Sequence, residues 1–208
     1  MANKRNYQKE LDRLIENLQK EGRVPKLFLH SCCAPCSSYV LEYLSRYFEI
    51  TVFYYNPNIY PAEEYHERAA EQKRFIDQFP AEHKISYIEG TYDTKRFYEM
   101  AKGLEKVPEG GERCFKCYEL RLRESAMLAK AGGFDYFTTT LSISPLKNAE
   151  KLNEIGEMLE AEYGVKHLTS DFKKKNGYKR STELSKEYEL YRQNYCGCIF
   201  SQNQYEKG

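Results

Sequence analysis

Seven cysteines, in three groups, are the residues of this sequence best suited to chemistry. The groups are Cys32, Cys33 and Cys36; Cys114 and Cys117; and Cys196 and Cys198. An odd number of cysteines is unusual for a disulfide framework, and no apolar stretch typical of a secretory signal follows the basic residues at the start. We therefore expect a cytoplasmic protein whose thiols are reduced, which favours metal binding or redox chemistry over structural disulfides.

The first two groups lie where we expect a loop to give way to a helix. Backbone N–H groups at a helix N-terminus stabilise anions, so thiolates at Cys32, Cys33 and Cys36 should be favoured. The spacing of Cys114 and Cys117 places both sulfurs on one side of a first helical turn. Four soft thiolates from two loops suit tetrahedral zinc or an iron–sulfur cluster, and the spacing does not distinguish them. The alternatives are packing as small apolar side chains, or redox thiols without a metal.

The third group differs because one glycine separates Cys196 from Cys198. Glycine permits a tight turn, so these two thiols could form a small, strained disulfide that is easily reduced. Such a pair would store two electrons. The alternatives are two further metal ligands, or two inert cysteines.

These groups must be positioned by alternating strands and helices. The expected helices cover residues 6–20, 37–47, 63–79, 113–131, 148–163 and 183–194, and the expected strands cover residues 26–31, 49–54, 84–88 and 134–139. The alternation predicts an α/β fold with a doubly wound parallel sheet, helices on both faces and a helical C-terminal extension. Ligands of such sheets bind beyond the carboxyl ends of the strands, where the first cysteine group is expected. Residues 92–111 are left unassigned, and residues 1–208 are taken as one catalytic domain.

Charge and hydropathy exclude some classes of protein. Lys and Arg number 32 against 31 Asp and Glu, so a surface for nucleic acid must be a local patch. Apolar runs are far shorter than the roughly 20 residues of a membrane helix, so no membrane span is expected.

Five segments, in this order, resemble the QueH family of cobalamin-independent epoxyqueuosine reductases. They are His30-Ser-Cys-Cys-Ala-Pro35; Tyr55-Asn-Pro-Asn-Ile59 with Glu64, Tyr65 and Arg68; Gly110-Gly-Glu-Arg-Cys-Phe-Lys-Cys-Tyr118; Phe137-Thr-Thr-Thr-Leu-Ser-Ile-Ser-Pro145; and Tyr191-Arg-Gln-Asn-Tyr-Cys-Gly-Cys198. Together they span residues 30–198, so the resemblance covers most of the chain.

The resemblance implies a nucleotide alpha-hydrolase-like fold and the last step of queuosine biosynthesis. That step is a two-electron reductive deoxygenation of epoxyqueuosine to queuosine at the wobble position of a tRNA, fed by an electron donor that the sequence does not identify. The resemblance also implies a [4Fe-4S] cluster held by Cys32, Cys33, Cys114 and Cys117, and a redox-active pair formed by Cys196 and Cys198.

A second, mononuclear iron is also implied. Cys36 stands where other members of the family carry an aspartate, so it could bind this iron through sulfur, or a cysteine of the third group could do so.

Other side chains near the expected site have two interpretations each. His30, Tyr65 and Tyr195 could donate protons or could simply pack, and Asn56 and Asn58 could contact substrate or form a turn around Pro57. Thr138, Thr139 and Thr140 could bind substrate or phosphate, or reflect β-propensity alone. The basic run of residues 173–180, helped by Arg121, Arg123 and Arg192, could contact tRNA phosphates or be a solvated loop.

The residues suggest three other functions, and they disfavour the first of these, which uses ATP. A PP-loop nucleotide-using enzyme would need a Ser-Gly-Gly-x-Asp-Ser loop after the first strand, and Ser31-Cys-Cys-Ala-Pro-Cys-Ser-Ser38 lacks its glycines. A non-catalytic RNA-binding protein with structural zinc is the second, and metal analysis would separate it from an iron–sulfur enzyme. A thiol–disulfide oxidoreductase would need no metal.

Overall fold

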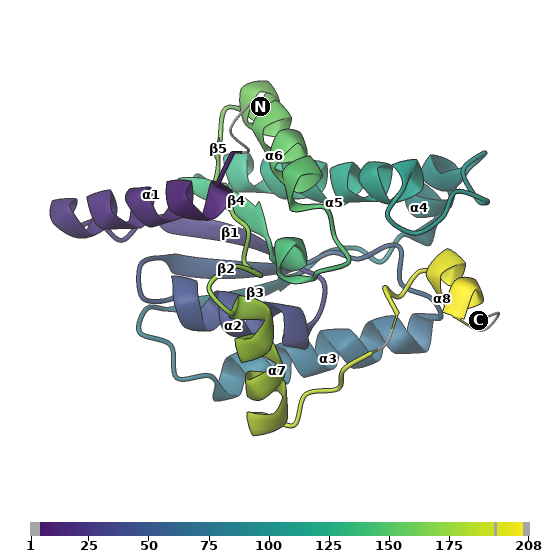
Figure 1. The fold of residues 1–208 in the computed structure, drawn as a ribbon, viewed down its shortest axis with the longest axis horizontal. Helices are drawn as coiled ribbons and strands as arrows, with labels where there is room; N and C mark the ends of the chain where they lie inside the picture. The colour runs from purple at the N-terminus through teal and green to yellow at the C-terminus, as the bar shows by residue number, and fades with distance from the viewer. Residues whose placement is uncertain (1–4, 194, 206–208) are drawn as a thin grey trace.

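Five parallel strands form the centre of the computed structural model, which describes residues 5–193 and 195–205 (Figure 1). The strands are β1 (Lys26–Ser31), β2 (Glu49–Tyr54), β3 (Ile85–Glu89), β4 (Tyr136–Thr139) and β5 (Lys166–His167), in the order β3-β2-β1-β4-β5. The helices are α1 (Tyr7–Glu21), α2 (Ala34–Leu44), α3 (Ala62–Gln78), α4 (Thr94–Ala101), α5 (Glu112–Ala131), the 3₁₀ helix η1 (Thr140–Ile143), α6 (Ala149–Tyr163), α7 (Gly177–Glu187) and α8 (Ile199–Tyr205). The predicted doubly wound α/β fold is confirmed.

Two hydrophobic cores lie on opposite faces of the sheet because side chains alternate along each strand. In β1, Leu27 and Leu29 pack in the core formed with α1, α2 and α3, whereas Phe28 packs in the other core with α5 and α6. In the same way Val52 of β2 faces the first core and Phe53 faces the second. A strand buried on both faces has an almost continuous apolar sequence, which is what β1 and β2 show.

The strand order reverses between β1 and β4. The chain runs from β1 outward through β2 to β3, then returns to place β4 on the other side of β1. At such a reversal the connections leave in opposite directions and open a crevice at the carboxyl ends of the two strands. Cys32 follows β1 directly and Thr140 follows β4 directly, so both lie at this crevice.

Most predicted helices are confirmed to within three residues, and their ends have clear causes. Asn6 and Asn148 cap α1 and α6 by accepting hydrogen bonds from backbone N–H groups of the first turn. Gly22 and Gly164 end the same helices in the left-handed conformation that glycine adopts without strain. Helix α2 begins three residues before the predicted start because Pro35 fits in a first turn, where no N–H is needed.

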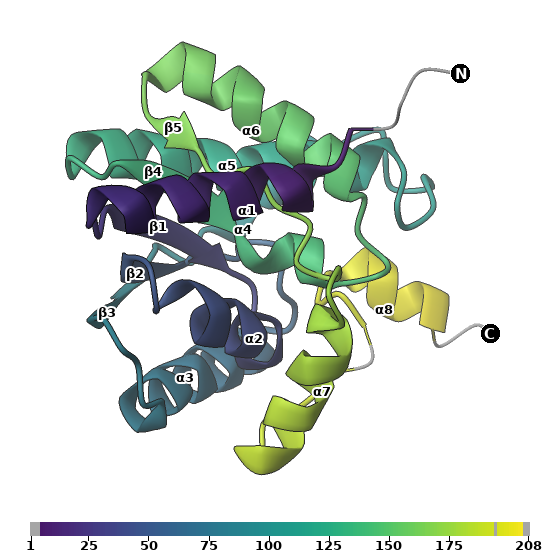
Figure 2. The same ribbon diagram turned by 60° about the vertical axis from the view of Figure 1, so that its left-hand side comes forward.

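The predicted helix over residues 183–194 is wrong in its bounds. Helix α7 spans Gly177–Glu187, and Asn194 lies outside the described residues. The helix stops because Glu189 has a φ of 50°, and the Leu190 N–H then turns back to the Ser185 carbonyl oxygen at 2.7 Å. Glycine usually occupies this left-handed position, so a glutamate gave no stop signal. Figure 2 shows α7 beside α2, against which it packs.

Four short elements were not predicted, and one of them is the 3₁₀ helix η1 directly after β4. Helix α4 lies in the unassigned segment, β5 has only two residues, and α8 follows the last cysteine. Helices α7 and α8 form the expected helical C-terminal extension. Within the described residues, none of the helices combines the length and apolar character needed to cross a membrane.

Candidate functional site

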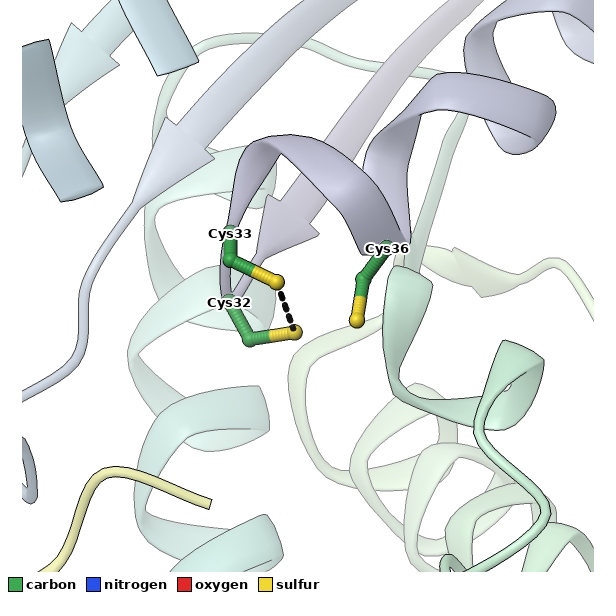
Figure 3. A group of neighbouring side chains, drawn as sticks. All are labelled: Cys32, Cys33 and Cys36. Atoms are coloured by element: carbon green, nitrogen blue, oxygen red, sulfur yellow. Dashed lines mark hydrogen bonds between the residues drawn. The ribbon is translucent and has the colours of Figure 1, made fainter. Parts of the chain in front are cut away.

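The three cysteines of the first group point their sulfurs toward one another (Figure 3). Their Sγ atoms all lie within 4.8 Å of one another, and those of Cys32 and Cys33 are 3.8 Å apart. Cys33 is the N-cap of α2, so the free N–H groups of the first helical turn begin here. Thr140, at the end of β4, accepts a hydrogen bond from the Cys32 N–H at 3.4 Å. Both strands at the crevice therefore fix the position of Cys32.

This group favours a single thiolate. Hydrogen bonds from Cys33 and Cys36 hold the pKa of Cys32 well below its usual range. The same hydrogen bonds raise the pKa of Cys33 and of Cys36, because each donates its proton to Cys32. Three neighbouring sulfurs that share one negative charge form a set of soft ligands ready to bind a metal ion as their protons leave.

The second group lies in the first turn of α5, next to both other groups. Cys114 belongs to the buried cluster against which Cys32 packs, and it accepts a hydrogen bond from the Gly110 N–H at 3.3 Å. Cys117, one turn on, packs in a buried cluster with Cys198. Across the described residues, the first group alone brings three potential ligand atoms within 4.8 Å of one another, so Cys114 and Cys117 are neighbours of that group rather than members of it.

The third group is held by charged and polar side chains. The buried Lys147 ammonium donates to the Cys196 Sγ at 3.2 Å and to a Glu109 carboxylate oxygen at 3.0 Å. The Ser201 hydroxyl donates to Glu109 at 2.8 Å and accepts from the Cys196 N–H at 3.2 Å. This network links the tail to the loop before α5 and places a positive charge at the Cys196 sulfur.

Glycine is required between the two tail cysteines. Gly197 has a φ of 106°, and a Cβ there would lie 2.9 Å from a nitrogen of the Arg68 guanidinium. The Gly197 carbonyl oxygen accepts a hydrogen bond from the Tyr60 N–H at 2.8 Å, which ties the tail to the loop before α3. Burial is the largest cause that raises the pKa of Cys198, to about 12, so its sulfur is held as a thiol.

A buried cation stands among the three groups. Arg121 is 1% exposed, donates through Nε to the Cys117 carbonyl oxygen, and donates through Nη1 to Asn56 Oδ1 at 3.3 Å. Burial acts to lower the pKa of Arg121, but the sulfurs of Cys117, Cys196 and Cys32 raise it on balance. Among the described residues no carboxylate pairs with it, so the cysteines are its source of negative charge. A buried guanidinium of this kind suits a site that carries several thiolates.

A cavity of about 370 Å³ opens beside these residues. Its wall includes Cys32, Cys33, Cys36 and Cys196, together with Asn56, Asn58, Arg68, Arg121, Lys147, Tyr195 and apolar side chains of the segment after β4. A cavity of this size holds a small ring system or a nucleobase with its substituent. Cysteines from two of the three groups therefore face the same space at the crevice between β1 and β4.

Comparison with known proteins identifies the family. The profile of the family described as "QueH: Epoxyqueuosine reductase QueH" matches residues 27–204. The chain belongs to the QueH family. Proteins named "Epoxyqueuosine reductase QueH" from Staphylococcus epidermidis and Streptococcus pyogenes are 46% and 42% identical over 200 and 198 residues, which is 94% of this chain in both cases and 84% and 78% of the relatives. The protein of that name from Thermotoga maritima is 35% identical over 181 residues, 84% of this chain and 89% of the relative.

Membership of the QueH family confirms the predicted resemblance, and the structure separates the candidate side chains. His30 is buried, with Nδ1 2.8 Å from Thr139 Oγ1 and Nε2 3.1 Å from the Tyr55 carbonyl oxygen, and burial lowers its pKa to about 3. Its ring is a neutral structural group, not a proton donor to the cavity. Tyr65 is likewise buried, and its hydroxyl donates to the Gly90 carbonyl oxygen at 3.2 Å. Packing therefore explains both residues.

The three threonines at the end of β4 and the start of η1 are also structural. Thr138 donates to the Leu168 carbonyl oxygen at 2.9 Å, Thr139 contacts His30, and Thr140 holds Cys32. Asn56, Asn58 and Tyr195, in contrast, lie in the cavity wall.

The predicted basic surface is largely neutralised in this member of the QueH family. Lys173, Lys175 and Arg180 pair with Asp171, Asp12 and Glu42 at 2.5, 2.7 and 2.6 Å. Arg123 pairs with Glu119 at 2.9 Å, and Arg121 is buried. The suggestion that Arg121 helps the basic run to contact tRNA phosphates is wrong, because its side chain is buried beside the cysteines. Arg192 remains at the cavity wall, 5.8 Å from the ring of Tyr178.

Three residues of the site were missed by sequence reasoning. Cys196 is surrounded by Lys147 and Glu109, which lie in two different loops, and by Ser201, which lies in α8. Lys147 lies two residues after Pro145, the last residue of a segment that resembles the family. That closeness is the one sequence signal that could have pointed to Lys147. The other two carry no distinguishing pattern.

Proposed function

We propose that this chain is an epoxyqueuosine reductase that acts in the cytoplasm on tRNA, with residues 1–208 as one catalytic domain. The reaction converts the epoxycyclopentane ring of epoxyqueuosine to the cyclopentene ring of queuosine. The convergence of three cysteine groups on one cavity is the observation that carries this proposal, because two of the groups line the cavity and the third packs against both. All three relatives described above bear the name of this activity.

Cys32, Cys33, Cys114 and Cys117 are the residues we propose to hold a [4Fe-4S] cluster. They offer four soft sulfur ligands, and Arg121 beside them supplies a buried positive charge that no carboxylate of the described chain takes up. Cys36, whose sulfur lies within 4.8 Å of the first two, is the proposed ligand of a second iron. When bound, the cluster supplies electrons one at a time and the second iron supplies a Lewis acid.

Cys196 and Cys198 are the proposed store of two electrons. Removal of the epoxide oxygen as water consumes two electrons and two protons. Oxidation of two thiols to a disulfide releases two electrons and two protons. Lys147 lies at the Cys196 sulfur, whereas Cys198 is buried next to Cys117. The pair is thus held between the cavity and the residues proposed to bind the cluster. An external donor must reduce the disulfide after each turnover.

The rim of the cavity is the proposed contact with tRNA. Arg192 and Tyr178 lie there together, offering a positive charge for phosphate and an aromatic face for an unpaired base. The basic run contributes less than its charge suggests, since most of its side chains are already paired.

The first test is purification without oxygen, followed by reconstitution, iron and sulfide analysis, and a turnover assay with tRNA that carries epoxyqueuosine. We expect visible absorption that bleaches with dithionite, about four sulfides per chain, and formation of queuosine. A colourless zinc protein from a properly reconstituted preparation would contradict the proposal.

A Cys196→Ser, Cys198→Ser double variant tests the electron store. It should keep its cluster absorption and its affinity for tRNA but lose turnover. Full turnover of this variant with a direct chemical reductant would remove the dithiol from the mechanism. The exposed Lys116→Ser variant on α5 serves as a control for purification and reconstitution.

A further inference from the structure

Three buried polar atoms in the cavity wall have no hydrogen-bond partner among the described residues. One of them, Arg68 Nη2, is ion-paired with Glu64 at 2.5 Å. The other two atoms have neither kind of partner within the described chain. They are Oδ1 of Asn58 and Nη2 of Arg121. Asn58 is 2% exposed and Arg121 is 1% exposed, and both line the cavity. A buried polar atom without a partner costs free energy, so a fold that keeps two of them in one wall leaves them for something that enters the cavity.

The wall is rigid at this point. Asn56 and Asn58 belong to a tight turn after β2, closed by a hydrogen bond from the Ile59 N–H to the Asn56 carbonyl oxygen at 3.2 Å, with Pro57 inside the turn. The Asn56 amide donates to the Ser31 carbonyl oxygen at 2.9 Å and accepts from Arg121. Asn56 therefore uses its amide to fix the turn and the guanidinium, and the oxygen of Asn56 is not available to a ligand.

The chemistry of the two atoms selects the group that fits them. Asn58 Oδ1 only accepts, and Arg121 Nη2 only donates. An anion would satisfy the guanidinium but not the amide oxygen, because neither an anion nor an amide oxygen has a proton to donate. A cation would be repelled by Arg121. A neutral hydroxyl group satisfies both, since it donates one hydrogen bond and accepts another.

Resting on the proposed function, we infer that Asn58 and Arg121 bind the vicinal hydroxyl groups of the cyclopentane ring of the substrate. One ring hydroxyl donates to Asn58 Oδ1, and a ring hydroxyl oxygen accepts from Arg121 Nη2. These two contacts orient the hydroxylated face of the ring, so that its opposite edge, which carries the epoxide, faces the cysteines in the same cavity. Asn58 and Arg121 set the specificity for a hydroxylated ring and take no part in the electron transfer.

A thermodynamic cycle between protein and ligand groups tests this assignment. The anaerobic, reconstituted protein is titrated with two tRNAs, one that carries epoxyqueuosine and one that carries 7-aminomethyl-7-deazaguanine at the same position, which lacks the hydroxylated ring. We expect Asn58→Ala to weaken the first complex by about 3- to 10-fold, the loss typical of one hydrogen bond, and to leave the second unchanged. Arg121→Lys, which keeps the charge but removes Nη2, should act in the same direction.

Controls separate recognition from folding. The iron and sulfide content of both variants should match that of the wild type, and Gln78→Ala, which removes an amide from the surface of α3, should bind both tRNAs as the wild type does. Because Asn58 lies in a turn, Asn58→Gly is a second variant that suits the backbone there. Equal weakening of both complexes, or no weakening of either, would overturn the inference. If the wild type itself does not distinguish the two tRNAs, the proposed function fails as well, whereas discrimination that survives Asn58→Ala refutes only the inference.

Discussion

Replacement of Lys147 by methionine should make the Cys196–Cys198 pair easier to oxidise. The Lys147 ammonium is 3.2 Å from the Cys196 sulfur and is 8% exposed, so its charge acts on the sulfur with little screening by water. A reduced sulfur accepts this charge-assisted hydrogen bond far better than a disulfide sulfur does. Lys147 therefore stabilises the dithiol over the disulfide, and the variant loses that preference.

The magnitude follows from the hydrogen bond. A hydrogen bond that involves a charged group is worth about 1.5–3 kcal/mol. For a two-electron couple, about 1.4 kcal/mol corresponds to 30 mV, so the midpoint potential of the pair should fall by about 30–65 mV. The stability of the fold should change less, because Glu109 loses the ammonium but keeps the Ser201 hydroxyl and is partly exposed.

The assay is equilibration in thiol–disulfide buffers of known potential, followed by alkylation and mass spectrometry of the peptide that contains Cys196 and Cys198. Lys151→Met is a matched control, since it removes an ammonium that is exposed on α6 and pairs with Glu154. A shift of the Lys147→Met variant to a more positive potential, or one no larger than that of the control, would refute the reasoning.

Three further predictions concern stability and tRNA affinity. Gly177→Ala should cost about 3 kcal/mol of unfolding free energy in urea, because a Cβ would lie 2.0 Å from the Phe172 carbonyl oxygen, whereas Gly103→Ala, with open space around it and a φ of +81°, should cost about 1–2 kcal/mol. Burial lowers the pKa of His30 and of His167 to about 3 in the folded chain, so the unfolded chain binds more protons below pH 6.5. The unfolding free energy should therefore fall as the pH drops from 6.5 toward 3, by up to about 1.4 kcal/mol per pH unit for each histidine, and urea titrations that show no such slope would contradict the burial argument. The affinity for tRNA should fall steeply with salt, with a log–log slope of about −0.7 to −0.9 for each phosphate contacted, and a flat response would contradict a phosphate contact at the cavity rim.

Local patterns predicted the central part of the fold. Strands β1 and β2 are apolar on both faces, and α1 and α6 have caps at both ends, so their types and bounds follow from the sequence alone. Helix α7 did not follow, because its end depends on a left-handed glutamate, a residue type that gives no stop signal in the sequence. Strand β5 has two residues, which is too short to show the alternation of apolar and polar side chains that identifies a strand.

The site was predicted in part for a similar reason. Cys32 and Thr140 each follow a strand, so both could be expected at the carboxyl edge of the sheet. That β1 and β4 are neighbours, which brings the two residues together, could not be read from the pattern of elements. The contact of Lys147 with Cys196 depends instead on the path of a tail without regular structure before α8. Periodicity carries no information on such a path, and the charge of Arg121 gave no hint that the side chain is buried.

The spacing of the three cysteine groups along the chain has a consequence for biosynthesis. They lie near residues 32, 114 and 196, so about 80 residues separate each group from the next, yet they pack together. A nascent chain emerging from the ribosome has the first group early, the second at mid-length, and the third only when nearly all of the described chain has been made. The folded scaffold of the sheet can therefore precede the complete centre, and a chain that stops before the third group would leave the Lys147 ammonium without the sulfur that it contacts.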